Sequence, residues 1–305
     1  MKRNLDPLND LSKNRPRLPK GQQVGLPVLR VKDLEKLLRF YEGPLGLRSV
    51  HRKKSPIDNL ELIEIGLKGE KNDFPLLVLK HDPQARETVH NFAGLFHFAI
   101  LLSDRKSLGY ALSGLQRKGI EFDGFADHLV SESLYLHDPE RNGIEIYRDK
   151  PMDEWPYDNK GLVIMDSLPL DLQSVLKEGE DLKKEHETFP NGARIGHMHL
   201  RVTNLEQSVD FYTKNLGLHI SSDWSNYGTM FLAAGNYHHH LGLNTWNSLN
   251  GKKHEQGETG LEMFAFNVEE SNSKIKPKSN EDLLLTDPDG IEITLNYNQA
   301  SRRFA

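Results

Sequence analysis

The sequence predicts an α+β protein assembled from four βαβββ modules, the fourth of which is abbreviated. The first observation behind this prediction is an internal duplication, because LPVLRVKDLEKLLRFYEGPLGL and HMHLRVTNLEQSVDFYTKNLGL match closely. The second is that two copies end alike, in HDPERNGIEIY at 137–147 and in TDPDGIEITL at 286–295. The four copies, two strong and two weaker, begin at Leu26, His97, His197 and Met263.

Each full copy shows the same order of elements. In the two strong copies, a short run of alternating apolar residues predicts a strand, and a break at Asp33-Leu34 or Asn204-Leu205 precedes helical spacing that ends in FY and a Leu-Gly-Leu turn. In the copy from His97 the predicted helix ends at Lys118-Gly119. The DP-containing turns are each followed by a closing strand. The fourth copy leaves little chain before its DP turn, so its helix and second strand are expected to be shortened or missing.

The modules are expected to pair in chain order, one with two and three with four. Residues 1–21 are polar and interrupted by proline, and they are expected to form a disordered arm. An N-terminal two-module domain without metal is expected at 22–150 and an acidic-basic linker at 151–193. A C-terminal two-module domain that binds metal is expected at 194–305.

Composition and charge restrict the class of partner. Hydrophobic residues make up 37% of the 305 residues, and no apolar run approaches the roughly 20 residues that a membrane helix needs. The net charge is −5 and basic residues are dispersed, so neither nucleic acid nor a membrane is expected as a partner. Because there are no cysteines and fourteen histidines, a metal would bind through His, Asp or Glu. Without an export signal, a cytoplasmic location is expected.

The motif H-x-x-L-x-V-x-[DN]-L…FY…LG, from His197 to Gly217, and the later strand DPDGIEI resemble the vicinal oxygen chelate superfamily. This superfamily includes glyoxalase, bleomycin-resistance proteins and extradiol dioxygenases. The four-module length, FHFAILLSDRK and YHHHLGLNTW are most similar to the bacterial catechol-2,3-dioxygenase-like proteins. The resemblance implies two half-open β-barrels of the glyoxalase/dihydroxybiphenyl dioxygenase type, with ferrous iron only in the C-terminal one.

Three consecutive histidines, His238 to His240, precede an apolar run and are interpreted as a strand that enters from a loop. A surface histidine run is the alternative, but the cluster lies between FLAAG and the apolar run. On a strand, His239 points opposite to its two neighbours. The resemblance implies that His239 is a metal ligand, with His240 as the fallback.

His197 and His199 lie two positions apart on a predicted strand, so both side chains face the same way and either could bind a metal. In the aligned repeats, Leu26, His97 and Met263 hold the slot of His197. The resemblance implies that the ligand is His197. His199 is then expected to support a ligand or to face the substrate.

Glu292 lies between two isoleucines, where a carboxylate is costly unless it is exposed or paired. A solvent-facing strand residue is the alternative, but the match between the repeats favours a functional role. With His197 and His239 it would form the two-histidine, one-carboxylate facial triad that leaves positions open on ferrous iron. Zinc, manganese or nickel could bind the same set.

The N-terminal half keeps His97 and Glu145 but has Leu26 and apolar residues at 76–79 where the other half offers ligands. Since two ligands rarely hold a metal, this half is expected to be a structural relic of the duplication. Two more of its side chains are expected to be ordinary strand-end residues, Tyr135 and His137.

Ring-cleaving members of the superfamily also use two further histidines and a tyrosine shortly before the glutamate. This chain has Trp224, Met263 and Leu284 near those positions, so the acid-base apparatus is expected to be depleted. Substitutes that could reach the barrel lumen are His199, His238 and Tyr237, which are expected to be catalytic, and also Tyr227.

The function expected from these observations is ring cleavage of a catechol-like aromatic diol by an extradiol-type dioxygenase, with O₂ as co-substrate. The alternative is a protein of the glyoxalase or bleomycin-resistance type that binds or isomerises a small ligand without oxygen chemistry. The identity of the substrate and the formation of a homo-oligomer stay open at this level.

Overall fold

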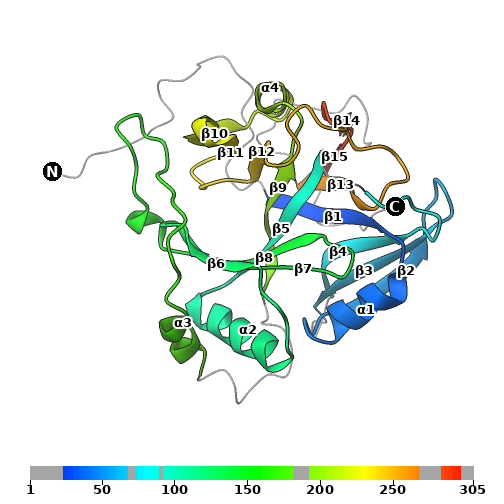
Figure 1. Ribbon diagram of the computed structural model, residues 1–305, viewed down its shortest axis with the longest axis horizontal. Helices are drawn as coiled ribbons and strands as arrows, with labels where there is room; N and C mark the ends of the chain where they lie inside the picture. Colours follow the sequence, from blue (N-terminus) through cyan, green and yellow to red (C-terminus); the bar gives the residue numbers. More distant parts are fainter. Residues whose placement is uncertain (1–22, 68–72, 89–91, 181–191, 268–282, 297–305) are drawn as a thin grey trace.

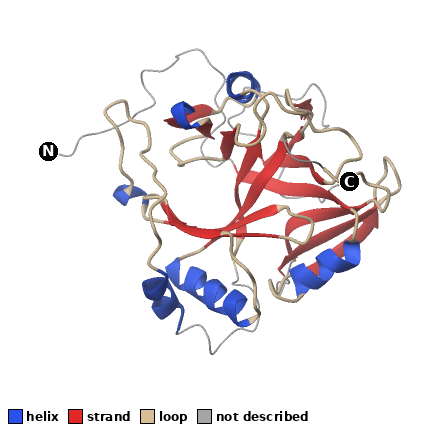
Figure 2. Cartoon of the chain, viewed as in Figure 1, coloured by secondary structure: helices blue, strands red, loops and turns tan. Residues whose placement is uncertain are grey.

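The computed structural model describes residues 23–67, 73–88, 92–180, 192–267 and 283–296. Two curled sheets form the centre of the molecule and the helices lie at its periphery (Figure 2). The α+β class, the half-barrel sheets and the repeated modules are therefore confirmed. The expected arm at 1–21 and the short connection inside the fourth module lie outside the described residues.

The first sheet has seven strands in the order β14-β15-β13-β1-β4-β3-β2. Its strand β1 pairs in parallel with β4 and antiparallel with β13. The bounds of these strands are β1 Gln23–Val31, β2 Arg48–Lys54, β3 Glu61–Leu67, β4 Phe74–His81, β13 Gly260–Asn267, β14 Leu283–Thr286 and β15 Glu292–Asn296.

The second sheet has eight strands in the order β10-β11-β12-β9-β5-β8-β7-β6. Its two central strands, β5 and β9, pair antiparallel, and each pairs in parallel with the last strand of its own module. The bounds are β5 Gly94–Leu102, β6 Gly124–Asp127, β7 Ser131–His137, β8 Gly143–Asp149, β9 Arg194–Arg201, β10 His219–Trp224, β11 Thr229–Ala233 and β12 Leu241–Asn244.

Four α-helices begin at side-chain caps of the type that the sequence offers. The carboxylate of Asp33, for example, accepts a hydrogen bond from the backbone N–H of Lys36, which satisfies one of the free donors of the first turn. The cap residues of the other three helices are Asp104, Asp171 and Asn204. The helices span α1 Leu34–Glu42, α2 Arg105–Arg117, α3 Leu172–Glu178 and α4 Leu205–Asn215. Among the described residues no helix is long and apolar enough to cross a membrane.

The modules do not pair in chain order. Module one joins module four through β1 and β13, whereas module two joins module three through β5 and β9 (Figure 1). The expected pairing of module one with module two, and of module three with module four, is therefore wrong. Each module exposes the same open edge on its first strand, so the repeat pattern alone does not determine which edges meet.

Adjacent modules along the chain nevertheless contact each other through the two motifs that define the repeat. The hydroxyl of Tyr41, in the FY end of α1, donates to Asp138 in the DP turn of module two at 3.0 Å. Tyr212 donates in the same way to Asp287 in the DP turn of module four at 2.8 Å. All four residues are buried, so these pairs lock one module to the next.

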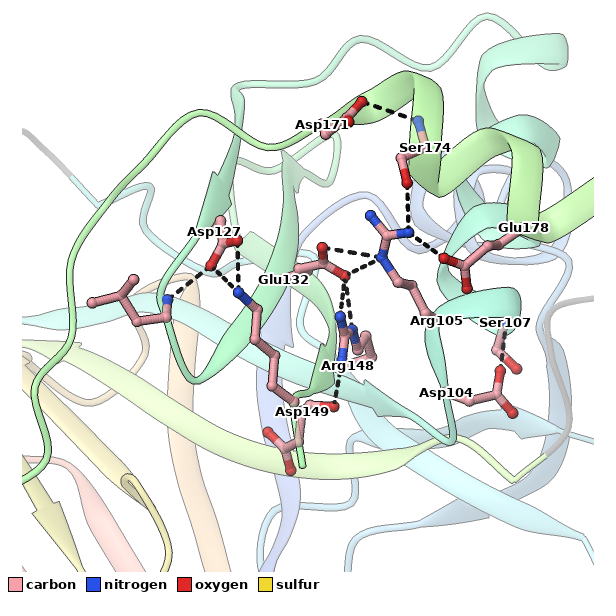
Figure 3. A network of polar contacts seen from close by, with 12 residues as sticks. Asp104, Arg105, Ser107, Asp127, Glu132, Arg148, Asp149, Asp171, Ser174 and Glu178 are labelled. Atoms are coloured by element: carbon pink, nitrogen blue, oxygen red, sulfur yellow. Dashed lines mark hydrogen bonds and ion pairs between the residues drawn. The ribbon is translucent and has the colours of Figure 1, made fainter. Parts of the chain in front are cut away.

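The segment expected to be a plain linker packs on the second sheet over its described part, 151–180. Trp155, Val163 and Met165 are buried against Val130 of module two. On α3, Ser174 and Glu178 accept hydrogen bonds from Arg105 at the start of α2 (Figure 3). The same arginine pairs with Glu132, which also binds Arg148 on β8. This connection therefore extends the fold of module two.

Candidate metal centre

Two histidines and a carboxylate meet on one face of the second sheet. They come from three neighbouring strands: His97 from β5, Glu145 from β8 and His197 from β9. The Nε2 atoms of His97 and His197 lie 3.0 and 2.9 Å from the same carboxylate atom, Glu145 Oε2. One ligand atom from each residue lies within 4.8 Å of the other two. This cluster bridges modules two and three.

Burial sets the protonation of the cluster. It lowers the pKa of His197 to about 4, so the ring is neutral near pH 7 and its nitrogen can act as a ligand. Burial raises the pKa of Glu145, but the adjacent His197 and His97 reverse this and hold that pKa well below its ordinary value. Ser133 also donates to Glu145 Oε1 at 2.6 Å, which fixes the carboxylate in place.

The cluster fits a divalent transition metal. Ligand atoms about 2.1 Å from an ion and at right angles to one another are about 3.0 Å apart, the spacing seen around Glu145 Oε2. His97 Nε2 is buried, and its 3.0 Å contact with Glu145 Oε2 lacks the geometry of a hydrogen bond, so an ion between the two atoms would satisfy it. Two neutral imidazoles with one carboxylate form the donor set of the facial triad.

The histidines of the sequence motifs surround this cluster. The ring of His239 lies 4.1 Å from that of His197, between centroids, and the ring of His199 lies 4.9 Å from that of His97. Burial lowers the pKa of both His239 and His199 well below the ordinary value, so both rings are neutral near pH 7. The structure therefore brings His197, His199 and His239 together.

At two positions an aromatic or imidazole ring lies so close to the backbone that only glycine fits. A Cβ atom on Gly242 would lie 2.8 Å from the ring of His199, and one on Gly196 would lie 1.8 Å from the hydroxyl of Tyr147. Gly242 on β12 is the register partner of His199, which explains the contact. Glycine at these two positions is thus a requirement of the packing.

A tyrosine-histidine pair flanks the cluster on the side of module two. Tyr135 on β7 is the register partner of Glu145, and its ring lies 5.6 Å from that of His97. Its hydroxyl is 2.6 Å from Nε2 of His128, whose Nδ1 is 2.6 Å from the carbonyl oxygen of Asp166. A carbonyl only accepts, so Nδ1 of His128 carries a proton. The connecting segment thus sets the tautomer of His128.

The side chain of His238 lies next to that of His239, and Tyr237 lies next to His238. The ring of His238 is fully buried, with Nδ1 2.7 Å from Nδ1 of His239. His240, the fallback ligand, instead accepts a hydrogen bond at Nδ1 from the backbone of Ala234 at 3.1 Å. These histidines precede β12, so they do not alternate as strand residues, and the expectation that His238 and His239 point to opposite sides is wrong.

Glu292 is not part of the cluster. It lies on β15 in the other sheet, opposite Met263, and the charged groups that act on its pKa are Glu262 and Lys80. Lys80 pairs with Asp58 and Glu262 at 2.6 Å, and Arg30 pairs with Glu262 at 2.7 Å. The sheet formed by modules one and four therefore carries a network of ion pairs around Glu292. The expected set of His197, His239 and Glu292 is not brought together, because module three pairs with module two.

The sequence matches one family model, the Glyoxalase/Bleomycin resistance protein/Dioxygenase superfamily, over residues 23–146 and 194–276. The chain belongs to this superfamily.

Two curated proteins that are similar to this chain differ in how much of it they cover. A protein named catechol-2,3-dioxygenase from Bacillus subtilis is 37% identical over 242 residues, which is 79% of this chain and 81% of the relative. A protein named lactoylglutathione lyase from Neisseria meningitidis is 29% identical over 131 residues, 42% of this chain and 91% of the relative.

Two solved structures share the fold at low sequence identity. A structure titled putative dioxygenase from Bacillus subtilis has a TM-score of 0.58 at 11% identity, covering 93% of this chain and 86% of that one. Glyoxalase I from Zea mays has a TM-score of 0.51 at 16% identity, covering 90% and 92%. The likeness extends over nearly the whole chain in both cases.

Four residues at or beside the cluster were not expected there from the sequence. His97 and Glu145 were expected to belong to a structural relic of the duplication, Tyr135 was expected to be an ordinary strand-end residue, and His128 was not singled out. The signal for the first two was present, since both occupy repeat slots equivalent to His197 and Glu292. They were dismissed because module two was assigned to the wrong neighbour. His128 had no signal of its own, since its role depends on the carbonyl of Asp166 in a segment expected to be a linker.

Proposed function

We propose that this chain is an extradiol-type dioxygenase that opens the ring of a catechol-like aromatic diol with O₂, using a mononuclear non-haem metal held by His97, Glu145 and His197. The observation that carries the proposal is the buried cluster of two histidines and one carboxylate, 2.9–3.0 Å apart at Glu145 Oε2. The relative named catechol-2,3-dioxygenase, matched over 79% of this chain, supports the same reaction.

Ferrous iron is the proposed metal, because two histidines and one carboxylate are the set used by non-haem iron oxygenases, although zinc, manganese or nickel could occupy the same ligands. When bound, the ion supplies Lewis acidity and leaves coordination positions open for the diol and for oxygen. The remaining chemistry falls to side chains of the chain itself.

Proton transfer is assigned to residues on either side of the cluster. His239 is buried, neutral near pH 7 and beside His197, so it can take a proton from a diol hydroxyl. Burial raises the pKa of Tyr135 well above its ordinary value, and Glu145 raises it further, so this hydroxyl keeps its proton and can donate it to a substrate oxygen. The contact with Nε2 of His128, at 2.6 Å, holds the tyrosine oxygen in place.

Aromatic side chains surround the two histidines next to the cluster. Phe96 and Trp246 both contact the ring of His199, and Phe231 contacts His199 and His239. Such rings pack against an aromatic substrate and exclude water from the charged groups. A small aromatic diol is therefore the proposed substrate class, and a cytoplasmic location stays a prediction.

The test is anaerobic loading of the full-length protein with Fe(II), followed by addition of catechol and air-saturated buffer. We expect one iron per chain, a yellow ring-fission product and one O₂ consumed for each catechol. Protein loaded with Zn(II) is the control and is expected to form no product.

The rival function is binding or isomerisation of a small ligand without oxygen chemistry, which the relative named lactoylglutathione lyase favours over 42% of this chain. Full iron loading without product or oxygen uptake across a panel of substituted catechols would reject the dioxygenase and leave this rival.

A further inference from the structure

We propose that the cavity beside Arg201 is a binding site for a small organic carboxylate. The cavity lies where the ends of β1 and β9 meet the starts of β5 and β13 and the DP turn of module two. Its volume is about 730 Å³, and pockets of roughly 300–1,000 Å³ hold small molecules. Its described lining includes no residue of the metal cluster, so the proposal does not depend on the proposed dioxygenase reaction.

Arg201 brings to this cavity a positive charge that no carboxylate in the described part of the chain neutralises. Its Nη2 donates to the carbonyl oxygen of Leu95 at 2.6 Å, and its guanidinium carbon lies 4.8 Å from the centre of the Phe92 ring. Its Nε is buried and has no hydrogen-bond partner. Removing a guanidinium from water without an acidic partner is costly. An anion that entered the cavity would supply the missing partner.

Arg30 is the residue of module one that corresponds to Arg201 in the repeat. It pairs with Asp82 at 2.6 Å and with Glu262 at 2.7 Å. The strand registers place two aromatic residues at the corresponding positions around Arg201, Trp246 and Phe96. The same arginine is therefore neutralised within the chain in one sheet and lacks both carboxylates in the other.

The pKa of Arg201 reflects the missing acid. Burial lowers this pKa, and no nearby charge opposes the shift. At Arg105 the hydrogen bond to Glu132 raises the pKa and a second one to Glu178 adds to this, although burial acts in the opposite direction (Figure 3). Because a guanidinium stays protonated at pH 7 even so, Arg201 keeps its full charge in the cavity.

The remaining charged groups of the cavity favour a monoanion. Lys32 pairs with Glu87 at 3.0 Å, and Glu140 accepts hydrogen bonds at Oε1 from the backbone N–H groups of Lys32 and Asp33 at 2.8 and 2.6 Å. Burial lowers the pKa of His254, so this ring of the lining is neutral near pH 7. The lining then holds four basic and three acidic residues: Lys32, Lys36, Arg141 and Arg201, and Asp33, Glu87 and Glu140. One carboxylate balances the excess positive charge, whereas the acids repel a dianion such as phosphate.

Apolar side chains give the cavity room for the organic part of such a ligand. Leu95, Leu261 and Pro139 line it together with Phe92. Pockets for small molecules combine an apolar lining with a few fixed polar groups, and a guanidinium matches a carboxylate in shape as well as in charge. Benzoate, which joins a carboxylate to an apolar ring, is therefore a suitable probe.

The test follows the Nε–H signal of Arg201 by ¹⁵N NMR in full-length protein loaded with Zn(II) and titrated with sodium benzoate. Comparison with Arg201→Lys assigns the signal. We expect a saturable shift with benzoate and none with benzamide, which has a similar shape but no charge. The Nε–H signal of Arg30, whose carboxylates are already in place, is the internal control and should not move. Inorganic phosphate should shift the Arg201 signal less than benzoate does.

Calorimetric titration of variants gives a second measurement. Arg201→Gln should bind benzoate about 10–100-fold more weakly, as expected for loss of a hydrogen bond to a charged group. Arg39→Gln, at an exposed arginine of α1, is the matched control and should bind like the unchanged protein. Without benzoate, Arg201→Gln should melt no lower than the unchanged protein, because it removes a charge that lacks a partner. Arg30→Gln should melt lower, because it takes the guanidinium away from two carboxylates.

An Arg201 signal that does not move with benzoate would overturn the proposal. Equal binding of benzoate by Arg201→Gln would also overturn it, because the benzoate would then lie elsewhere, for example at the metal. A larger shift with phosphate than with benzoate would reject a carboxylate as the ligand. A lower melting temperature of Arg201→Gln would contradict the unpaired charge from which the site is inferred.

Discussion

Glu145 and Glu292 are equivalent in the repeat but differ in what surrounds them. Glu145 faces two histidines on neighbouring strands, whereas Glu292 lies among Glu262 and Lys80 in the other sheet. Glu145→Gln should therefore lose tight metal binding, because it removes the only anionic ligand of the cluster, and Glu292→Gln should keep it. Metal content after dialysis measures both. Retention by Glu145→Gln together with loss by Glu292→Gln would restore the set expected from the sequence.

The proposed role of the Tyr135 hydroxyl in proton transfer can be tested by a single substitution. Tyr135→Phe removes the hydroxyl that contacts Nε2 of His128 but no metal ligand. We expect unchanged metal content and a kcat lower by about 10²–10⁴-fold, the usual contribution of a positioned acid or base. Tyr227→Phe, at a tyrosine that is 73% exposed, serves as the control. Full activity in Tyr135→Phe would exclude the tyrosine from proton transfer.

At this scale the sequence could predict the residue types better than their grouping. His197, His199 and His239 were expected beside a metal, and the structure brings them together. The structure places Glu145, and not Glu292, beside these histidines, because the choice between two equivalent glutamates depends on which sheet edges join. Likewise His238 was expected to act on substrate, whereas it lies behind His239, since the residues before β12 form a loop.

The two buried tyrosine–aspartate pairs, Tyr41–Asp138 and Tyr212–Asp287, each connect a helix of one module to the DP turn of the next. Burial raises the pKa of Asp138 to about 6, despite the hydrogen bonds from Asn142 and Tyr41. The folded protein then binds a proton that the unfolded chain, with an aspartate pKa near 3.9, has already released. The free energy of unfolding should therefore fall as pH rises from about 4 to about 6, by on the order of 3 kcal/mol from this residue.

Asp138→Asn removes this titration, so its free energy of unfolding should change less between pH 4 and pH 7 than that of the unchanged protein. Urea denaturation at several pH values measures the difference. Asp210→Asn, at an exposed carboxylate paired with Lys214, is the control and should leave the slope as it is. If the free energy of unfolding changed with pH equally in Asp138→Asn and in the unchanged protein, titration of Asp138 would not be the cause.

Elements with a strong local pattern were predictable and those set by long-range contacts were not. The strand-helix-turn order of modules one to three follows from apolar periodicity and from caps such as Asp33 and Asn204. The polar composition of 151–180 instead suggested a linker. Its packing depends on a few apolar residues, Trp155, Val163 and Met165, whose partners lie on module two and on module three.

Over the whole molecule, the metal centre divides its ligands between the two halves of the chain. His97 and Glu145 precede the connecting segment and His197 follows it. Residues 1–180 and 181–305, expressed separately, should therefore hold no metal, whereas the two fragments expressed together should hold one ion per pair. Metal analysis of the purified fragments measures this. Tight binding by 181–305 alone would contradict the pairing of modules two and three.

The nested pairing of the modules also sets an order for folding during synthesis. The eight-stranded sheet needs no strand beyond β12, which ends at Asn244, so it can be completed while the last module is still being made. The seven-stranded sheet needs β13 to β15, which follow β12 along the chain and leave the ribosome after it. Until then β1 presents an open edge on its β13 side, the kind of edge at which unfinished chains associate wrongly. The nascent chain thus first completes the sheet that carries the proposed metal ligands, and it is most exposed to misassembly at β1.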